Sequence, residues 1–127
     1  MKSYTDIEQS KRLSEILPLK SADGFYEAQL NPITDEWEYI LFTGNEWASE
    51  EVVIPCWSLV ALLNVLPISI DEGQHCLALI NSNPNGDIEW LCGYEDYKGN
   101  LMTACYGGNQ IDACMEMILK LKEYNLL

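Results

Sequence analysis

The stretch IPCWSLVALLNVLP, residues 54 to 67, is the feature that most restricts what this chain can fold into. Only Ser58 and Asn64 offer polar side chains in it, although the chain carries a formal net charge of -13. Pro55 suits the first turn of a helix and Pro67 its end, which leaves about twelve residues between them. A helix that spans a bilayer needs roughly twenty residues. We therefore predict a central helix that is apolar on all sides and covered by other elements on more than one of them.

Two segments before this stretch predict a helix and a hairpin. Thr5, with Glu8 three residues later, forms a capping-box pattern, which predicts a helix over residues 5–17 that ends at Pro18. The segments FYEAQL (25–30) and WEYILFTG (37–44) are rich in aromatic and branched residues, and the turn-like NPITDE separates them. This pattern is typical of two antiparallel strands joined by a tight loop.

The C-terminal half predicts a three-stranded meander built from HCLALIN, DIEWLCGYE and LMTACYG. The connecting loops PNG (84–86) and YKG (97–99) both end in Gly, as in a type I turn closed by a left-handed residue. With these turns Ala78, Cys92 and Ala104 line up across the sheet. One side of the sheet is then free of charge; it consists of Cys76, Ala78, Ile80, Ile88, Trp90, Cys92, Tyr94, Met102, Ala104 and Tyr106.

A last helix follows Gly107 and Gly108, with Asn109 as its N-cap. Its apolar stripe consists of Ile111, Cys114, Met115, Ile118 and Leu121, and we expect it to pack on the charge-free side of the meander. At 127 residues, with 48% hydrophobic and 10% aromatic residues, the chain fits one ordered domain. We predict a single α+β domain over residues 1–127 in the order αββαβββα. Its antiparallel sheet combines the hairpin and the meander, and its helices lie on one face.

The distribution of charge limits the classes of partner. Fourteen Asp and Glu residues lie between Ser21 and Tyr97, and this span contains no Lys or Arg. Such a field repels phosphate groups and anionic lipid, so we expect no direct binding to nucleic acid or membrane. A partner protein with a basic surface fits this charge, whereas the simpler interpretation is that the acidic residues only keep the protein soluble. The pattern does not indicate an oligomeric state.

The N-terminus and the cysteines indicate a cytoplasmic location. MKSYTDIEQSKR mixes charges from its second residue and lacks the apolar core of a signal peptide. The five cysteines have no CxxC spacing, and in a reducing compartment such a set is expected to remain as free thiols.

The sequence predicts no catalytic residue, no cofactor and no metal ligand. Residues 81–92 imitate a calcium loop, but Cys92 stands where a bidentate Glu is needed. Cys56 and His75 are the only pair that suggests a Cys-dependent enzyme, and their acidic, apolar surroundings oppose a thiolate. A Cys-dependent enzyme is therefore the third alternative for the function. Gly107-Gly108, before the last helix, could bind an anion through free N–H groups, but Asn109 and Asp112 already occupy that helix end.

Trp47 is the candidate contact residue for a partner, together with Glu46, Glu50 and Glu51. An aromatic side chain among carboxylates offers contact area and a ring face to Lys or Arg. The alternative is that Trp47 folds back as a lid over the edge of the core, because Trp is highly buried on average.

The segments YTDIEQSKRLSEILPLKSAD, IPCWSLVALLNVLP and IDACMEMILKLKEYNLL resemble a family of small proteins from gut Bacteroidales and their phages or mobile elements. The resemblance implies no assigned activity and no catalytic residues. It fits an accessory protein of the cytosol, and because the sequence shows no catalytic motif we expect a non-enzymatic protein that acts by protein–protein interaction. The alternative that it suggests is an acidic mimic of nucleic acid or an immunity-type inhibitor.

Overall fold

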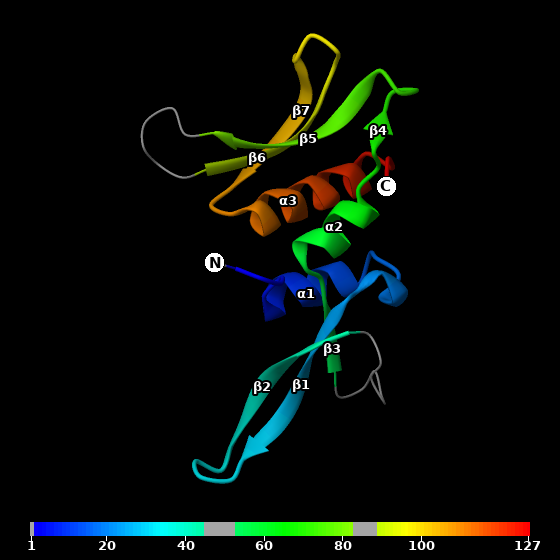
Figure 1. Ribbon diagram of the computed structural model, residues 1–127. Helices are drawn as coiled ribbons and strands as arrows, with labels where there is room; N and C mark the ends of the chain where they lie inside the picture. Colours follow the sequence, from blue (N-terminus) through cyan, green and yellow to red (C-terminus); the bar gives the residue numbers. More distant parts are fainter. Residues whose placement is uncertain (1, 45–52, 83–88) are drawn as a thin grey trace. The chain divides into compact units, whose positions relative to one another are not determined.

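The computed structural model of the chain describes residues 2–44, 53–82 and 89–127 (Figure 1). The predicted α+β class and the predicted order of helices and strands are confirmed, with a short 3-10 turn, η1, and two short strands, β3 and β4, in addition. The elements are α1 (Ile7–Ser14), η1 (Leu19–Ser21), β1 (Gly24–Asn31), β2 (Glu36–Thr43), β3 (Val53–Cys56), α2 (Leu59–Val65), β4 (Ser69–Ile70), β5 (His75–Ser82), β6 (Glu89–Glu95), β7 (Leu101–Gly107) and α3 (Gln110–Glu123).

The strands form two antiparallel sheets instead of the one that the sequence predicted. The chain has two compact units: residues 4–61, here the N-terminal unit, and residues 62–127 with the first three residues, here the C-terminal unit. The hairpin lies in a three-stranded sheet of order β2-β1-β3, and the meander lies in a four-stranded sheet of order β4-β5-β6-β7. The extent of a single domain over residues 1–127 stays a prediction.

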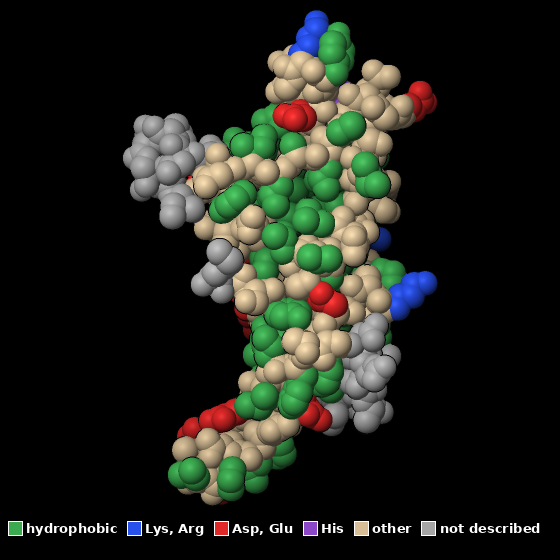
Figure 2. All heavy atoms as spheres, in the orientation of Figure 1, with side chains coloured by type: hydrophobic (Ala, Val, Ile, Leu, Met, Phe, Trp, Pro, Cys, Tyr) green, Lys and Arg blue, Asp and Glu red, His purple; other side chains and the backbone are tan. Residues whose placement is uncertain are grey.

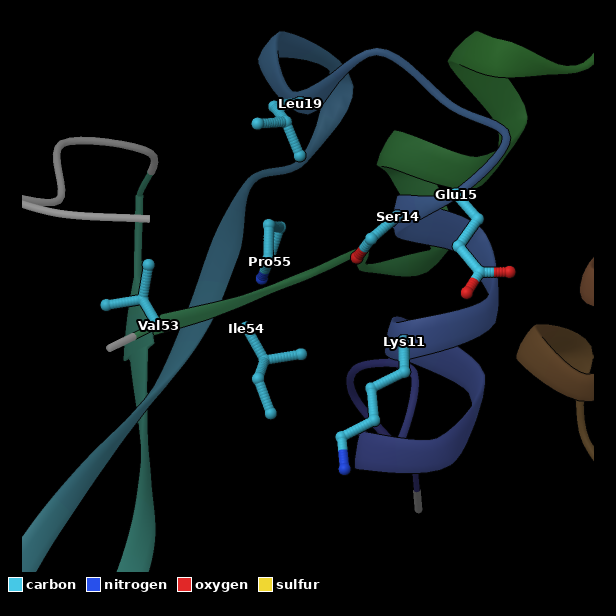
Figure 3. A pocket seen from close by; sticks show the side chains of 7 residues that line it. All are labelled: Lys11, Ser14, Glu15, Leu19, Val53, Ile54 and Pro55. Atoms are coloured by element: carbon cyan, nitrogen blue, oxygen red, sulfur yellow. The ribbon is translucent and has the colours of Figure 1, made fainter. Parts of the chain in front are cut away.

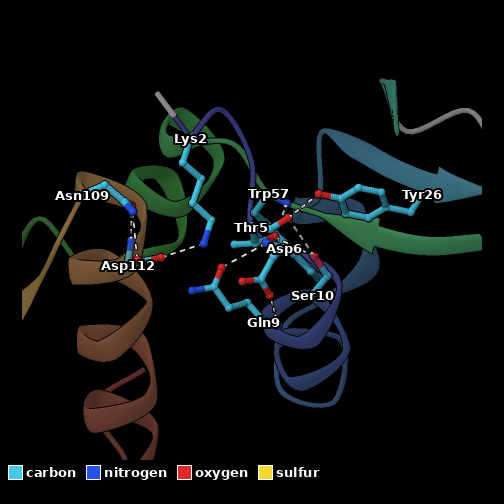
Figure 4. A network of polar contacts seen from close by, with 9 residues as sticks. All are labelled: Lys2, Thr5, Asp6, Gln9, Ser10, Tyr26, Trp57, Asn109 and Asp112. Carbon is cyan, nitrogen blue, oxygen red and sulfur yellow. Dashed lines mark hydrogen bonds and ion pairs between the residues drawn. The ribbon is translucent and has the colours of Figure 1, made fainter. Parts of the chain in front are cut away.

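The first helix begins two residues later than the sequence predicted. Asp6, not Thr5, is the N-cap, and its carboxylate accepts from the backbone N–H of Gln9 at 2.8 Å. Thr5 is instead fully buried, where its hydroxyl accepts from the backbone N–H of Trp57 at 3.1 Å and pairs with Ser10 at 2.8 Å (Figure 4). The capping-box prediction was therefore wrong by one residue, because Thr5 anchors the chain to Trp57 and the next side chain caps the helix.

The predicted hairpin is confirmed. β1 and β2 pair without interruption from Gly24 opposite Thr43 to Asn31 opposite Glu36. In the turn, the Asn31 side chain accepts from the backbone N–H of Ile33 at 2.9 Å, and Asp35 adopts a φ of 58°. β3 pairs only with residues 24–27 of β1. The half of the hairpin next to the turn is therefore two strands wide, and it extends past α1 and β3 in the N-terminal unit (Figure 1).

The prediction of a helix that begins at Pro55 was wrong for the first half of the segment. Pro55 lies in β3, opposite Phe25 of β1, and α2 spans only Leu59–Val65. β3 is the end strand of its sheet, where the missing N–H of a proline costs no ladder hydrogen bond. The second half is helical and partly covered, since Leu62 is fully buried while Val60 is exposed.

The last helix is confirmed in its cap and in its stripe. Asn109 accepts from the backbone N–H of Asp112 at 2.9 Å, as an N-cap residue does. All five residues of the predicted stripe are buried: Ile111, Cys114, Met115, Ile118 and Leu121. α3 packs on β6 and β7, and Cys92 and Tyr94 of β6 are fully buried.

The charge-free side predicted for the meander was wrong as a set. The YKG turn forms as predicted, with the Asp96 N–H donating to the Asn100 carbonyl at 2.9 Å. A bulge between Tyr94 and Glu95 shifts the pairing of β6 with β7, so that Cys105 instead of Ala104 lies opposite Cys92. In the β5–β6 pair, Leu79 instead of Ala78 lies opposite Cys92; the PNG turn between these strands lies outside the described residues. Cys92 and Tyr94 of β6 are buried as predicted, whereas four members of the set on β5 and β7 are exposed: Cys76, Ile80, Met102 and Tyr106.

Candidate functional site

Cys56, the residue that first suggested nucleophilic chemistry, is held as a neutral thiol. It is fully buried in β3, and burial raises its pKa to about 12, with a further rise from the Asp23 carboxylate. A thiol is a nucleophile only as the thiolate, so this site opposes the chemistry at neutral pH. His75, at the start of β5, has Nδ1 3.4 Å from the Asp71 carboxylate, but this atom makes no hydrogen bond within the described parts of the chain.

The other cysteines belong to the packing of the C-terminal unit or to its surface. All five thiols are free, as predicted. Cys92 and Cys114 share a hydrogen bond between β6 and α3, and this bond together with burial raises the pKa of Cys92. Burial also raises the pKa of Cys105, and Cys76 is exposed. These surroundings keep Cys92 and Cys105 protonated, whereas the hydrogen bond with Cys92 lowers the pKa of Cys114.

Metal, membrane and anion sites find no support in the described residues. In residues 2–44, 53–82 and 89–127, no group of three or more His, Cys, Asp or Glu side chains is placed to hold a metal ion. The middle of the calcium-like segment lies outside these residues. No helix within them is long and apolar enough to cross a membrane. At the start of α3, the Asp112 carboxylate accepts from the Asn109 side-chain amide and lies 2.8 Å from the Lys2 ammonium nitrogen (Figure 4). This carboxylate occupies the position in which an anion would bind.

An open pocket of about 410 Å³ lies in the N-terminal unit between α1 and β3 (Figure 3). It is lined by Lys11, Ser14, Glu15, Leu19, Val53, Ile54 and Pro55. Lys11 and Glu15 are both exposed in its lining. The pocket offers shape and some apolar surface, but no arrangement of reacting groups.

The predicted contact residues Trp47, Glu46, Glu50 and Glu51 lie outside the described residues. Their role in binding a partner therefore stays a prediction.

The hairpin presents an exposed apolar surface that the sequence analysis did not single out. Residues directly opposite each other in an antiparallel pair share one side of the ribbon, and successive residues alternate between sides. The register thus collects six side chains on one side, here the hairpin apolar side: Tyr26, Ala28, Leu30, Trp37, Tyr39 and Leu41. Trp37 is 71% exposed, Tyr39 47%, Leu30 46% and Leu41 40%.

The other side of the same ribbon is polar and acidic toward the turn. This hairpin polar side consists of Glu27, Gln29, Asn31, Glu36 and Glu38, with the exposed Ile40 opposite Glu27. Asn31 donates to Glu38 at 3.0 Å and Gln29 donates to Glu27 at 3.2 Å, so amides and carboxylates bond to each other along the ribbon. Its inner end is closed by the stacked rings of Phe25 and Phe42, 5.3 Å apart. Figure 2 shows hydrophobic side chains following the hairpin to its tip, with Asp and Glu side chains beside them.

Comparison with known protein families, with curated proteins and with solved structures finds no match for this chain.

The sequence contains a signal for the hairpin apolar side, although it predicted only the hairpin and not the exposure of that side. Both strands alternate around the turn, with Leu30 and Trp37 apolar and Asn31 and Glu36 polar. An alternating strand predicts one apolar side without saying what covers it. The first helix has few apolar positions, and of its residues only Ser10 and Leu13 are buried. That shortage of covering surface was the signal that this side stays exposed.

Proposed function

We propose that this protein is a non-enzymatic accessory protein that binds another protein through the hairpin apolar side. The observation that supports the proposal is the exposure of Trp37, Tyr39, Leu30 and Leu41 on one side of a single ribbon. Scattered apolar residues are normal on a surface, whereas a contiguous group that includes aromatic rings is typical of a binding site. Trp and Tyr are also the residues that contribute most to protein–protein affinity.

Charge defines the kind of partner. Glu27, Glu36 and Glu38 lie on the reverse of the same ribbon, and Asp35 is in its turn. A partner that covers the apolar side and reaches around its edge meets these carboxylates. We therefore propose a partner with an apolar centre and basic residues at its rim, which also gives fast, salt-sensitive association.

The proposal is tested by affinity capture from the source cells, with mass spectrometry of the proteins retained. The bait is compared with a Trp37→Ala, Tyr39→Ala double variant. The matched control replaces two exposed tyrosines outside the hairpin, Tyr97→Ala and Tyr124→Ala. We expect the wild type and the control to retain the same partner and the hairpin variant to lose it. Measured with the purified partner, truncation of each contact ring costs about 2 kcal/mol, or about 30-fold in Kd.

Retention of the partner by the folded double variant would remove the hairpin apolar side from the interface. An acidic mimic of nucleic acid behaves in the opposite way. It loses its partner when Glu27, Glu36 and Glu38 become Gln and keeps it when Trp37 becomes Ala, because carboxylates then replace phosphates in the contact.

A further inference from the structure

The outer edge of β2 is an unpaired strand edge. β2 ends the order β2-β1-β3, and within the described residues no strand pairs with its other side. Edge strands are usually protected by Pro, Lys, bulges or short length. β2 contains neither Pro nor Lys and pairs with β1 over eight residues without a bulge. Its two charged side chains, Glu36 and Glu38, both lie at the turn end, so the rest of the strand, residues 39–43, is an open template for another strand.

The register indicates which backbone groups face this edge. The N–H of Gly44 donates to the carbonyl of Asp23 at 2.7 Å, which makes these two residues a hydrogen-bonded pair. Hydrogen-bonded and non-bonded pairs alternate along an antiparallel ladder. Counting from Gly44, the residues of β2 whose N–H and C=O groups point outward are Trp37, Tyr39, Leu41 and Thr43. The first three are the β2 members of the hairpin apolar side.

We infer that the partner is bound as an added β-strand on the outer edge of β2, and that this strand alternates apolar with basic residues. The inference rests on the proposed function and states how the same surface is used. A strand added beside β2 places every second side chain next to Trp37, Tyr39 and Leu41. Near the turn the remaining side chains lie next to Glu36 and Glu38, where Lys or Arg is complementary, and farther along β2 they lie next to Ile40 and Phe42.

A second copy of this chain fits the edge less well. Pairing β2 with β2 places Glu36 and Glu38 of both copies on the two strands of one ribbon. Each copy also carries a formal net charge of -13, so the approach of the two is repelled. With a basic strand, both the contact with Glu36 and Glu38 and the long-range interaction between the two chains become attractive. Charge thus favours a different, basic chain at this edge.

The test uses the unmodified protein and a synthetic peptide of eight residues, the length of β2, in which Val and Lys alternate. Its composition-matched control has the Val and Lys residues in two separate blocks. Two further peptides carry N-methyl groups, one on every Val and the other on every Lys. An N-methyl group removes a donor and blocks one edge of a strand while it leaves side chains and charge intact. Affinity is measured by isothermal titration calorimetry, and the protein's oligomeric state by analytical ultracentrifugation.

We expect the alternating peptide to bind about 10-fold more tightly than the block peptide. N-methylation of one alternate set should weaken binding about 10-fold or more, and N-methylation of the other set should leave it nearly unchanged. The set that matters reports whether the added strand is antiparallel or parallel. Trp37→Ala should lower the affinity for the alternating peptide, and Tyr97→Ala should leave this affinity unchanged.

Three results would overturn the inference: equal affinity for the alternating and block peptides, the same effect from both N-methyl sets, or a stable dimer that the peptide does not dissociate. The proposed function is judged separately by the captured partner. If Trp37→Ala, Tyr39→Ala still abolishes capture while both N-methylated peptides bind alike, strand addition is wrong and the apolar contact remains. If the partner is retained by that variant, the proposed function itself is wrong.

Discussion

The C-terminal sheet and the hairpin of the N-terminal unit are built from the same kind of strand, but among the described residues only the C-terminal sheet has a helix packed across it. α3 is 14 residues long and buries seven side chains, and it packs on β6 and β7. α1 is 8 residues long, and its main contact is with β3, at the base of the hairpin. The difference shows that alternation alone does not place a strand in a core. An apolar side becomes core when the same unit supplies an amphipathic helix long enough to cover it.

The largest expected effect comes from weakening that cover. Ile118 is fully buried in α3, so Ile118→Ala leaves a cavity and should lower the free energy of unfolding by about 3 kcal/mol in urea denaturation. Trp37→Ala, which removes a larger side chain from the hairpin apolar side, should cost less than about 0.5 kcal/mol. Similar losses from the two variants would mean that the hairpin apolar side is part of a core, and the comparison would fail.

The junction between β7 and α3 offers a second test with a matched control. A Cβ at Gly107 would lie 2.5 Å from the backbone N of Ala113, whereas a Cβ at Gly108 meets nothing within 4 Å. Gly107→Ala should therefore force α3 away from β7 and cost about 2 kcal/mol, while Gly108→Ala should cost much less. Thermal melting followed by circular dichroism measures both. Equal melting temperatures for the two variants would contradict the close approach of α3.

The burial of Cys56 at the base of the hairpin should make the free energy of unfolding depend on pH above about 9. The pKa of the buried Cys56 thiol is raised to about 12, so the folded state keeps its proton at pH values where the unfolded chain loses it. Its contribution to stability is fully present below the unfolded pKa of about 9 and is lost as the pH rises toward 12. The free energy of unfolding should therefore decrease over this interval, and Cys56→Ala should flatten the decrease. An equal slope in the variant would show that Cys56 does not titrate as a buried thiol.

The smallest effect should come from salt. The acidic residues between Ser21 and Tyr97 repel one another without intervening Lys or Arg. Raising the sodium chloride concentration from about 0.05 M to about 0.5 M should screen this repulsion and stabilise the fold by about 1 kcal/mol or less. Replacing Glu36 and Glu38 by Gln should reduce the gain. A melting temperature that decreases steadily with added salt would contradict the prediction.

Features set by neighbouring residues were predictable from the sequence. Three local features each depend on a side chain that accepts from a backbone N–H within a few residues: Asn31 in the hairpin turn, Asp96 at the YKG turn and Asn109 at the helix cap. For the same reason the hairpin and the last helix were found with nearly correct bounds.

Features set by contacts distant in sequence were not predictable. Thr5 is a residue type that often caps helices, but its hydroxyl instead accepts from the backbone N–H of Trp57, 52 residues away. Pro55 fits a helix start and an edge strand equally well, and only the pairing with β1 decides between them. The bulge between Tyr94 and Glu95 has no local marker, and it shifts the pairing of β7 with β6 by one residue, so that Cys105 instead of Ala104 lies opposite Cys92.

The candidate surface was missed for a related reason. The alternation of β2 predicts an apolar side, but nothing in a strand's own pattern tells whether a helix will cover that side. The number of apolar residues in the nearby helix distinguishes a covered strand side from an exposed one, and α1 has few of them. The Trp47 segment, chosen for its composition, lies outside the described residues and stays a prediction.

The contrasting positions of two tryptophans make the protein its own optical probe. Trp57 is fully buried, and its indole N–H donates to Ser21 at 2.9 Å, whereas Trp37 lies near the hairpin tip with most of its ring in water. Indole emission moves to longer wavelength in polar surroundings, so Trp37 should contribute to the red side of the spectrum and Trp57 to the blue side. A molecule that settles on the hairpin would then shift the emission of Trp37 and shield it from a soluble quencher, while Trp57 stays as an internal reference. Binding can in this way be followed on the unlabelled chain, with the Trp37→Ala variant identifying which part of the spectrum reports it.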